Sequence, residues 1–458
     1  MKIEDFNSIY FVGAGGIGMS ALVRYFLAKN LPVGGYDKTP SKLTEQLIVE
    51  GAQIHYEDNP KLIPDVFKDK GNTLVIYTPA IPESHKELAF FKENEFTIMK
   101  RAQVLGLITR SSKGLCIAGT HGKTTTSTML AHLLHESSVG CTAFLGGISE
   151  NYHTNLLVDK NSPYTVIEAD EFDRSFHQLH PYISVITSAE PDHLDIYGTK
   201  EAYLKSFVDY TSLTASDGVL LIRQGLEITP ELPKGTSCFT YSRDSGDYHA
   251  KNIRIEDGEV YFDFVGPEIE IANVKLGVPV AINIENGIAA MAVAHLCGAT
   301  PKEIKQAMGT FKGVERRFEF LVKNQKHVFI NDYAHHPAEI KQSILSVKEL
   351  YPSRKVTVVF QPHLFSRTKD FYQDFAQSLA LADCVILLDI YPAREEPIEG
   401  VTSDLIYQEI SLPKGKKEMS STKDIISLLS TLDTDIILTL GAGDINLLTP
   451  QIKALLDV

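Results

Sequence analysis

The chain has 458 residues, of which 43% are hydrophobic and 22% are charged, proportions typical of a soluble globular protein. This length predicts two to four domains, and the apolar content excludes an intrinsically disordered chain. The 44 Lys and Arg against 58 Asp and Glu give a formal net charge of −14, which argues against general nucleic-acid binding. An anionic small molecule remains possible, because backbone amides, a few local cations and Mg²⁺ can hold it.

No membrane segment or signal peptide is expected. No apolar run approaches the roughly 18 residues that a membrane-spanning helix needs, and residues 1–6 carry acids in place of an apolar core. The five cysteines form no CxxC pair, which predicts free thiols in a reducing cytosol and no cysteine-based zinc site. We therefore expect a cytoplasmic protein with no membrane partner.

Alternating strand and helix signals divide the chain into three blocks, residues 1–110, 111–315 and 316–458. They predict an α/β protein of three domains: a Rossmann-like N-terminal domain, a central parallel-sheet domain like that of P-loop ATPases, and a Rossmann-like C-terminal domain. In the first block we expect a helix from 17 to about 29 and strands at 9–12, 31–36 and 74–77. In the second we expect a helix at 284–297, a few antiparallel edge strands within 235–275, and buried strands at 115–118, 165–168, 183–187 and 219–223. In the third we expect strands at 328–330, 356–360, 385–388 and 436–439.

A glycine-rich turn follows the first strand and opens a helix. Its glycines allow a tight turn and a close backbone approach to a phosphate, and they are Gly13, Gly15, Gly16 and Gly18. NAD binding is the usual interpretation of this GxGxxG pattern, another diphosphate nucleotide is the alternative, and a turn without a ligand is the third. Asp37 lies near the distance at which a ribose-binding acid would stand.

A second glycine-rich loop, residues 119–124, follows a buried strand and opens a helix. Its Gly-Lys-Thr core predicts a phosphate-binding loop, in which amides cradle the phosphates, Lys123 reaches the β/γ-phosphates and the Thr124 hydroxyl ligates Mg²⁺. The usual pattern would place its first glycine at Ile117, and the nearest glycine is Gly119. We therefore interpret the loop as a shortened variant.

Acids and a histidine follow the next two strands. Glu168, Asp170 and Glu171 close one strand, and Asp192 and His193 follow the next. Because strand C-termini line the ligand crevice of an open α/β sheet, a carboxylate there could hold the Mg²⁺ of a nucleotide and the histidine a second metal. Any one of these residues is as often a solvated loop residue, so the prediction rests on their joint position beside the phosphate-binding loop.

The third block places histidines and arginines after its strands. His335 and His336 are adjacent and point apart, so we expect one in a site and the other in its support. Arg367 could clamp a carboxylate through a bidentate fork, and a cation of the pair Arg316 and Arg317 could swing onto a phosphate as domains close.

Together these motifs resemble the Mur ligase family of peptidoglycan synthesis. The segments that carry the resemblance span essentially the whole chain in the family's order: 119–125, 168–171, 192–195, 283–286, 316–319 and 332–337. The resemblance implies that ATP phosphorylates a carboxylate to an acyl phosphate, which an amine then attacks. Within the family, residues 13–20, 333–337 and 360–363 favour the member that joins L-alanine to the muramoyl carboxylate of UDP-N-acetylmuramate.

The resemblance also implies roles for single residues. Lys123 would hold the phosphates, Thr124 and Glu168 the first Mg²⁺, and His193 the second. Asn286 would contact the adenine of ATP, Asp332 its ribose and Arg317 its phosphates. The remaining contacts of the phosphate-binding loop would come from Gly119, Thr120, Gly122 and Thr125. The first glycine turn, with Asp37 beside it, would take the UDP diphosphate, which displaces the NAD interpretation. The residues around the incoming alanine would be Tyr333, His335, His336 and Arg367.

Three positions depart from the family's pattern. Phe207 stands where related ligases often carry a carbamylated lysine, and Lys205 is out of register, so we expect no carbamyl-lysine. Ile282 replaces a familiar histidine, which leaves one nucleotide contact open. Leu364 replaces an arginine, so Arg367 alone would meet the carboxylate of the amino acid. His335 is a candidate for the base that deprotonates the amine.

Other functions stay open at this point. A recycling ligase that adds a murein tripeptide to UDP-N-acetylmuramate would share these motifs but need a larger pocket. A P-loop ATPase module would leave the first glycine turn unexplained, and an NAD-dependent oxidoreductase would have to bind NAD. We expect a monomer or a weak homodimer, and domains that close on each other during an ordered reaction.

Overall fold

The computed structural model describes residues 3–256, 258–393 and 395–457, and the chain forms two compact units. The first unit contains the chain up to Asn252 together with the segments Phe262–Lys275 and Glu285–Phe311. The second contains the chain from Lys312 onward together with Ile253–Tyr261 and Leu276–Ile284. Domain boundaries near residues 110 and 315 stay a proposal.

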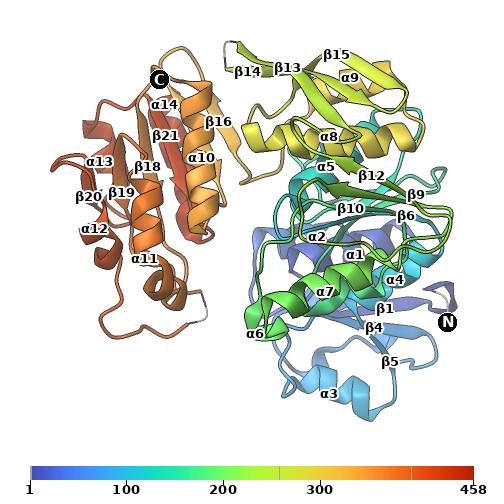
Figure 1. Ribbon diagram of the computed structural model, residues 1–458. Coiled ribbons are helices and arrows are strands. Elements are labelled where there is room, and N and C mark those ends of the chain that lie inside the picture. Colours follow the sequence, from blue (N-terminus) through green and yellow to red (C-terminus); the bar gives the residue numbers. More distant parts are fainter. Residues whose placement is uncertain (1–2, 257, 394, 458) are drawn as a thin grey trace. The chain divides into compact units, whose positions relative to one another are not determined.

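The first unit begins with a five-stranded parallel sheet in the order β3-β2-β1-β4-β5. Its strands β1, β4 and β5 are labelled in Figure 1. Its strands are β1 (Ser8–Val12), β2 (Val33–Tyr36), β3 (Gln53–His55), β4 (Thr73–Tyr77) and β5 (Thr97–Lys100). The helices are α1 (Ile17–Ala28), α2 (Lys42–Val49), α3 (Lys86–Glu93) and α4 (Arg101–Arg110), with short 3-10 turns at Ile3–Asp5, Pro60–Leu62 and Asp65–Phe67. This order confirms the Rossmann-like prediction, and it puts the first glycine turn where the strand order reverses.

The same unit contains a seven-stranded sheet in the order β12-β11-β10-β6-β9-β7-β8, parallel except for β7 with β8. Its strands are β6 (Lys113–Ala118), β7 (Thr142–Phe144), β8 (Leu156–Leu157), β9 (Tyr164–Ala169), β10 (Pro181–Ile186), β11 (Val219–Arg223) and β12 (Ser237–Tyr241). The expectation of an antiparallel edge strand is wrong for β12, which pairs in parallel with β11. Residues 224–236 form a connection long enough to return to the same end of the sheet, whereas an antiparallel hairpin usually has a loop of two to five residues.

Helices and a small sheet complete this part of the chain. They are α5 (Lys123–His135), the 3-10 segment η4 (Phe172–Gln178), α6 (Leu194–Tyr197), α7 (Lys200–Thr211), α8 (Ala281–Leu296) and α9 (Pro301–Thr310). A three-stranded sheet has the order β13 (His249–Glu256), β14 (Glu259–Gly266) and β15 (Ile269–Leu276). Phe207 of α7 is fully buried, as an apolar side chain on the inner face of a helix should be.

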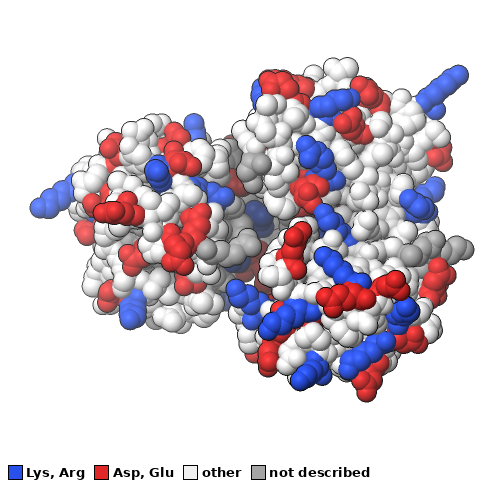
Figure 2. Space-filling view, turned by 90° about the horizontal axis from the view of Figure 1, so that it is seen from below, with Lys and Arg blue, Asp and Glu red and all other residues white. Residues whose placement is uncertain are grey.

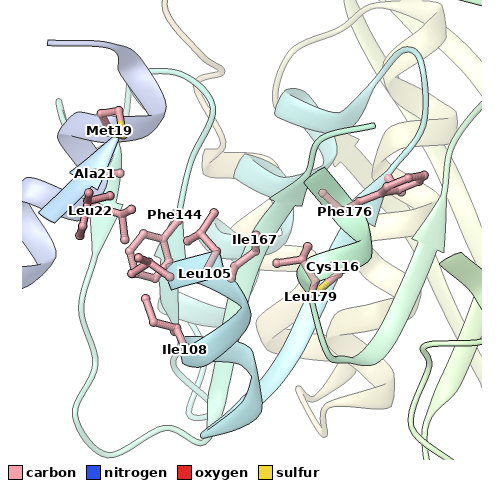
Figure 3. Packing of buried hydrophobic residues seen from close by; sticks show 14 of the residues in the cluster. Met19, Ala21, Leu22, Leu105, Ile108, Cys116, Phe144, Ile167, Phe176 and Leu179 are labelled. Carbon is pink, nitrogen blue, oxygen red and sulfur yellow. The ribbon is translucent and has the colours of Figure 1, made fainter. Parts of the chain in front are cut away.

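One hydrophobic core runs through the first unit from the N-terminal sheet to the central sheet (Figure 3). Leu22 of α1 and Leu105 of α4 belong to the same buried cluster as Phe144 of β7 and Ile167 of β9. Burial of such side chains is the main favourable contribution to folding. The two glycine loops, after β1 and after β6, are therefore carried by one packed body.

The second unit is built on a six-stranded sheet in the order β16-β17-β21-β18-β19-β20, with only β16 antiparallel to its neighbour. Its strands are β16 (Glu319–Lys323), β17 (Val328–Asp332), β18 (Val356–Phe360), β19 (Cys384–Leu387), β20 (Lys417–Met419) and β21 (Ile436–Leu440). The helices are α10 (Pro337–Leu350), α11 (Phe365–Leu379), α12 (Asp404–Glu409), α13 (Ile425–Thr431) and α14 (Thr449–Leu456), with a 3-10 turn at Asp444–Leu448. The four strands expected here are confirmed.

Several coarse expectations can be compared with the structure. No helix in the described part of the chain is both long enough and apolar enough to cross a membrane. The five cysteines are free thiols, as predicted. Acidic and basic side chains are interspersed on the face drawn in Figure 2, so that face presents no continuous basic field.

Candidate active site

The first glycine turn is held by hydrogen bonds to the end of β2. The backbone N–H groups of Gly13 and Ala14 both donate to the carbonyl of Tyr36, at 2.8 and 2.9 Å. Gly13 has φ of +91°, a conformation that favours glycine. The Gly15 N–H donates to Oδ2 of Asp37 at 2.7 Å, so this acid shapes the turn. A Cβ on Gly15 would lie 2.5 Å from the side chain of Thr44. The turn therefore needs glycine at Gly13 and Gly15, and diphosphate binding by Gly13, Gly15, Gly16 and Gly18 stays a prediction.

The second glycine loop surrounds the side chain of Lys123. The ammonium donates to the carbonyls of Gly119 at 2.5 Å and Thr120 at 3.2 Å, and it pairs with Glu171 at 2.8 Å. Burial lowers the pKa of Lys123, but the carboxylates of Glu171 and Glu168 outweigh burial, so the net shift is upward and the lysine stays charged. Gly122, with φ of +82°, precedes α5 and lets the loop turn into the helix.

Thr124 and Glu168 come together as the sequence predicts. The Thr124 hydroxyl donates to Oε2 of Glu168 at 2.9 Å. A hydroxyl and a carboxylate are hard oxygen ligands, and Mg²⁺ at nucleotide sites commonly uses one or two protein oxygens with water and phosphates. Gly146 leaves room around this carboxylate, since a Cβ there would lie 1.9 Å from Oε2. The two residues thus fit one Mg²⁺.

His193 lies in a different loop. It precedes α6 with φ of +52°, its ring contacts that of Phe172, and its Nε2 is 3.7 Å from Asp192. Within residues 3–256, 258–393 and 395–457, no group of three His, Cys, Asp or Glu is arranged to hold a metal by itself. A second Mg²⁺ on His193 stays a prediction.

The nucleotide-side residues lie around the second loop. Thr126 donates to Oδ1 of the buried Asn286 at 3.2 Å, which brings α8 to the loop. A Cβ on Gly122 would lie 2.8 Å from that same oxygen. The Thr120 hydroxyl lies 2.7 Å from the hydroxyl of Tyr203, and Thr125 is partly exposed in the first turn of α5.

A cavity of about 140 Å³ lies in the first unit, lined by residues of α1, of α4 and of the end of β9. Its lining includes Gly18 of the first glycine turn together with Arg101, Glu168 and Asp170. The Arg101 guanidinium lies 3.3 Å from Asp170, and a Cβ on Gly18 would clash with it. Sequence reasoning missed Arg101, because its only signal is a basic residue at a helix start after a short strand.

In the second unit, three of the four residues expected around alanine form one group. The ring centroids of Tyr333 and His335 are 5.2 Å apart, and those of His335 and His363 are 6.0 Å apart. His363 Nδ1 in turn lies 3.3 Å from the Arg367 guanidinium. Burial, with help from His335 and Arg367, lowers the pKa of His363 to about 4. His363 was not among the predicted site residues, although it follows a strand end.

The environment of His335 favours a neutral imidazole. Its Nδ1 lies 3.0 Å from the Tyr333 carbonyl, to which an Nδ1–H can donate, and this tautomer leaves Nε2 as the acceptor. Burial lowers the pKa of His335, while Glu339, with Nδ1 at 3.6 Å from its carboxylate, opposes that shift. A neutral histidine with a free lone pair has the chemistry of a general base.

The other predicted residues of this unit have structural partners. His336 caps α10 by accepting the Ala338 N–H at 3.4 Å, and its ring contacts Phe371. Asp332 accepts hydrogen bonds from the Ser343 hydroxyl and the Phe318 N–H. The guanidinium of Arg317 lies 4.9 Å from the centre of the Tyr333 ring, as a cation–π contact. Their roles toward ligands stay predictions.

Comparison with family models matches three successive segments of the chain. Residues 8–113 match "Mur ligase family, catalytic domain", residues 117–294 match "Mur ligase middle domain" and residues 316–443 match "Mur ligase, glutamate ligase domain". The matches follow the order of the three blocks.

Relatives and solved structures give the same picture. The UDP-N-acetylmuramate–L-alanine ligase of Phocaeicola vulgatus is 62% identical, with all of both chains covered, and that of Parabacteroides distasonis is 59% identical, with 100% of this chain and 98% of the relative covered. The crystal structure of UDP-N-acetylmuramate–alanine ligase from Thermotoga maritima aligns with a TM-score of 0.82 at 26% identity, covering 97% of each chain. A murein peptide ligase from Psychrobacter arcticus shares the fold, with a TM-score of 0.65 at 22% identity over 98% of this chain and 99% of that one.

Proposed function

The chain belongs to the Mur ligase family, and from this premise we propose the reaction that its site carries out. The protein is an ATP-dependent ligase of peptidoglycan precursor synthesis, and it joins L-alanine to the muramoyl carboxylate of UDP-N-acetylmuramate. The observation that supports this most is the cavity lined by both Gly18 and Glu168, because a sugar nucleotide anchored at Gly18 would extend its acyl end toward Glu168, whose carboxylate accepts a hydrogen bond from Thr124.

ATP supplies the leaving group that a carboxylate lacks. A muramoyl carboxylate oxygen attacks the γ-phosphorus, ADP leaves, and the acyl phosphate that results is open to attack by the alanine amine. The tetrahedral intermediate then loses inorganic phosphate and leaves the amide. The charged Lys123, in its loop of backbone amides, lowers the repulsion between two approaching anions.

Thr124 and Glu168 would hold one Mg²⁺, since their oxygens are adjacent and of the right kind. When bound, Mg²⁺ adds positive charge at the phosphates. Arg101 would orient the acyl end of the sugar nucleotide, because its guanidinium lines the same cavity. ATP and Mg²⁺ as ligands of these named residues are part of the proposal.

The second unit would bind the amino acid. The Arg367 guanidinium suits the alanine carboxylate, and Nε2 of His335 can accept a proton from the ammonium. Tyr333 offers an aromatic surface to the methyl group.

We place the enzyme in the cytoplasm, where its nucleotide substrates would be found, and we expect a monomer or a weak homodimer.

Isotope transfer tests the acyl-phosphate route. With the muramoyl carboxylate labelled with ¹⁸O, the proposal requires one ¹⁸O in the phosphate that is released with the amide product. Phosphate without label would rule out attack of the carboxylate on ATP.

A further inference from the structure

The ammonium of Lys123 is fully engaged within the protein. A lysine has three N–H donors. The oxygens around this one are the carbonyls of Gly119 and Thr120, at 2.5 and 3.2 Å, and the carboxylate of Glu171, whose two oxygens lie at 2.8 and 3.1 Å. A phosphate that approaches Lys123 must therefore displace at least one partner.

Glu171 is the charged partner, and it is held firmly. Its side chain is 2% exposed, and that of Lys123 is 13% exposed. The Glu171 carbonyl accepts a hydrogen bond from Tyr197, and the next turn is fixed by the Phe176 N–H donating to the Asp170 carbonyl. A buried ion pair at this distance is screened little by solvent, so it competes with an incoming anion more strongly than a surface pair would.

The neighbouring acids have other partners. Asp170 lies 3.3 Å from Arg101, and Glu168 accepts from Thr124. The three carboxylates of this segment thus contact three different side chains, and the carboxylate that pairs with Lys123 is that of Glu171.

From this arrangement we propose that Glu171 is a positioning residue that holds Lys123 inside the loop when no nucleotide is bound and so lowers the affinity for ATP. The inference rests on the proposed function only in taking ATP as the ligand of Lys123. Nucleotide binding requires the lysine to turn from the carboxylate to the phosphates, and the backbone carbonyls of the loop keep it within reach. Glu171 thereby sets how much ATP is needed before the site is occupied.

Calorimetric titration with a non-hydrolysable ATP analogue and Mg²⁺ tests this on the full-length protein. Glu171→Gln keeps the shape and removes the charge, so the dissociation constant should fall about 3- to 10-fold. Glu171→Asp, which withdraws the carboxylate by one methylene, should give a smaller decrease and serves if the glutamine variant does not fold. Asp170→Asn removes the same charge one residue away without touching Lys123, and its dissociation constant should change less.

A double-mutant cycle identifies the partner. In a Lys123→Ala background, Glu171→Gln should no longer change the affinity for the analogue. Unchanged or weaker binding in Glu171→Gln, or equal tightening in Asp170→Asn, would overturn the proposal. If the wild-type protein itself does not bind the analogue, the proposed function fails, which is a different result.

Discussion

In the proposed mechanism, Lys123 is the residue on which nucleotide chemistry depends most. Replacing it with alanine removes the cation of the phosphate-binding loop, while the first glycine turn and its core remain intact. We expect Lys123→Ala to lower kcat by at least about 10²-fold, because a preorganised charge at the transferred phosphate is lost. Steady-state kinetics and calorimetry with UDP-N-acetylmuramate check this.

The sugar nucleotide should still bind to Lys123→Ala with nearly unchanged affinity. Lys113→Ala is a suitable control, because that lysine is exposed at the start of β6 and contacts tyrosine rings. Equal loss of catalysis and of sugar-nucleotide binding would show that the two glycine loops do not act separately.

Arg367 carries the prediction for the amino acid. Arg367→Ala should raise the KM for L-alanine about 10- to 100-fold, as expected when a charge-assisted hydrogen bond to a carboxylate is removed. The KM for ATP should change far less. Lys369→Ala, which removes an exposed cation on the same helix, should leave both constants unchanged. If the KM for ATP alone rises, the placement of alanine beside Arg367 is wrong.

At the scale of secondary structure, a buried polar group connects β1, β3 and α3. Glu87 of α3 is fully buried, and it accepts a hydrogen bond from Tyr10 of β1 at 2.7 Å. Its other oxygen lies 3.2 Å from His55 of β3. Burial raises the pKa of Glu87 to about 7 and lowers the pKa of His55 from its ordinary value, so both shifts favour the uncharged form of each group.

This pKa gives the stability a predicted pH dependence. The folded state holds the Glu87 proton more tightly than the unfolded state does. The contribution of this proton to the free energy of unfolding is therefore present below pH 4.5 and is lost as pH rises to about 7. The unfolding midpoint of Glu87→Gln, relative to wild type, should therefore increase between pH 5 and pH 7 and then level off. Thermal unfolding of both proteins across this pH range measures the difference between their midpoints. The control is Glu83→Gln, which changes an exposed carboxylate. A constant offset at every pH would exclude a proton-linked Glu87.

How far sequence alone predicts this fold depends on how local each signal is. The glycine turn at 13–18 and the loop at 119–124 were predictable, since strand, turn and helix follow one another within a few residues. The strands β3 and β5 were missed, because they are short and only partly buried, which leaves no run of apolar residues.

The candidate site was predictable only where a motif is contiguous. Thr124 and Glu168 lie side by side as expected, because Thr124 lies at the start of the helix after β6 and Glu168 stands at the end of the neighbouring strand β9. Arg101 and Glu171 take their ionic partners from segments distant in sequence, so no spacing could identify those partners.

At the scale of the whole molecule, the nucleotide loop and the group around Arg367 belong to different compact units. Acyl transfer needs the amine within reach of the acyl phosphate, so we expect the ligands to bring the two units together in a closed state during the reaction. Small-angle scattering should show a smaller radius of gyration with an ATP analogue plus UDP-N-acetylmuramate than without ligands. An unchanged radius would argue against closure.

The measurement that tests the central claim most directly is phosphate release from ATP and Mg²⁺ in the presence of UDP-N-acetylmuramate, with one acceptor at a time. The acceptors are L-alanine, L-serine, glycine, D-glutamate and the murein tripeptide. We expect release that depends on both UDP-N-acetylmuramate and L-alanine, with weaker release for serine and glycine, since a methyl-sized difference is worth only about 1–3 kcal/mol. Release with the tripeptide alone, or without any acceptor, would contradict the assignment.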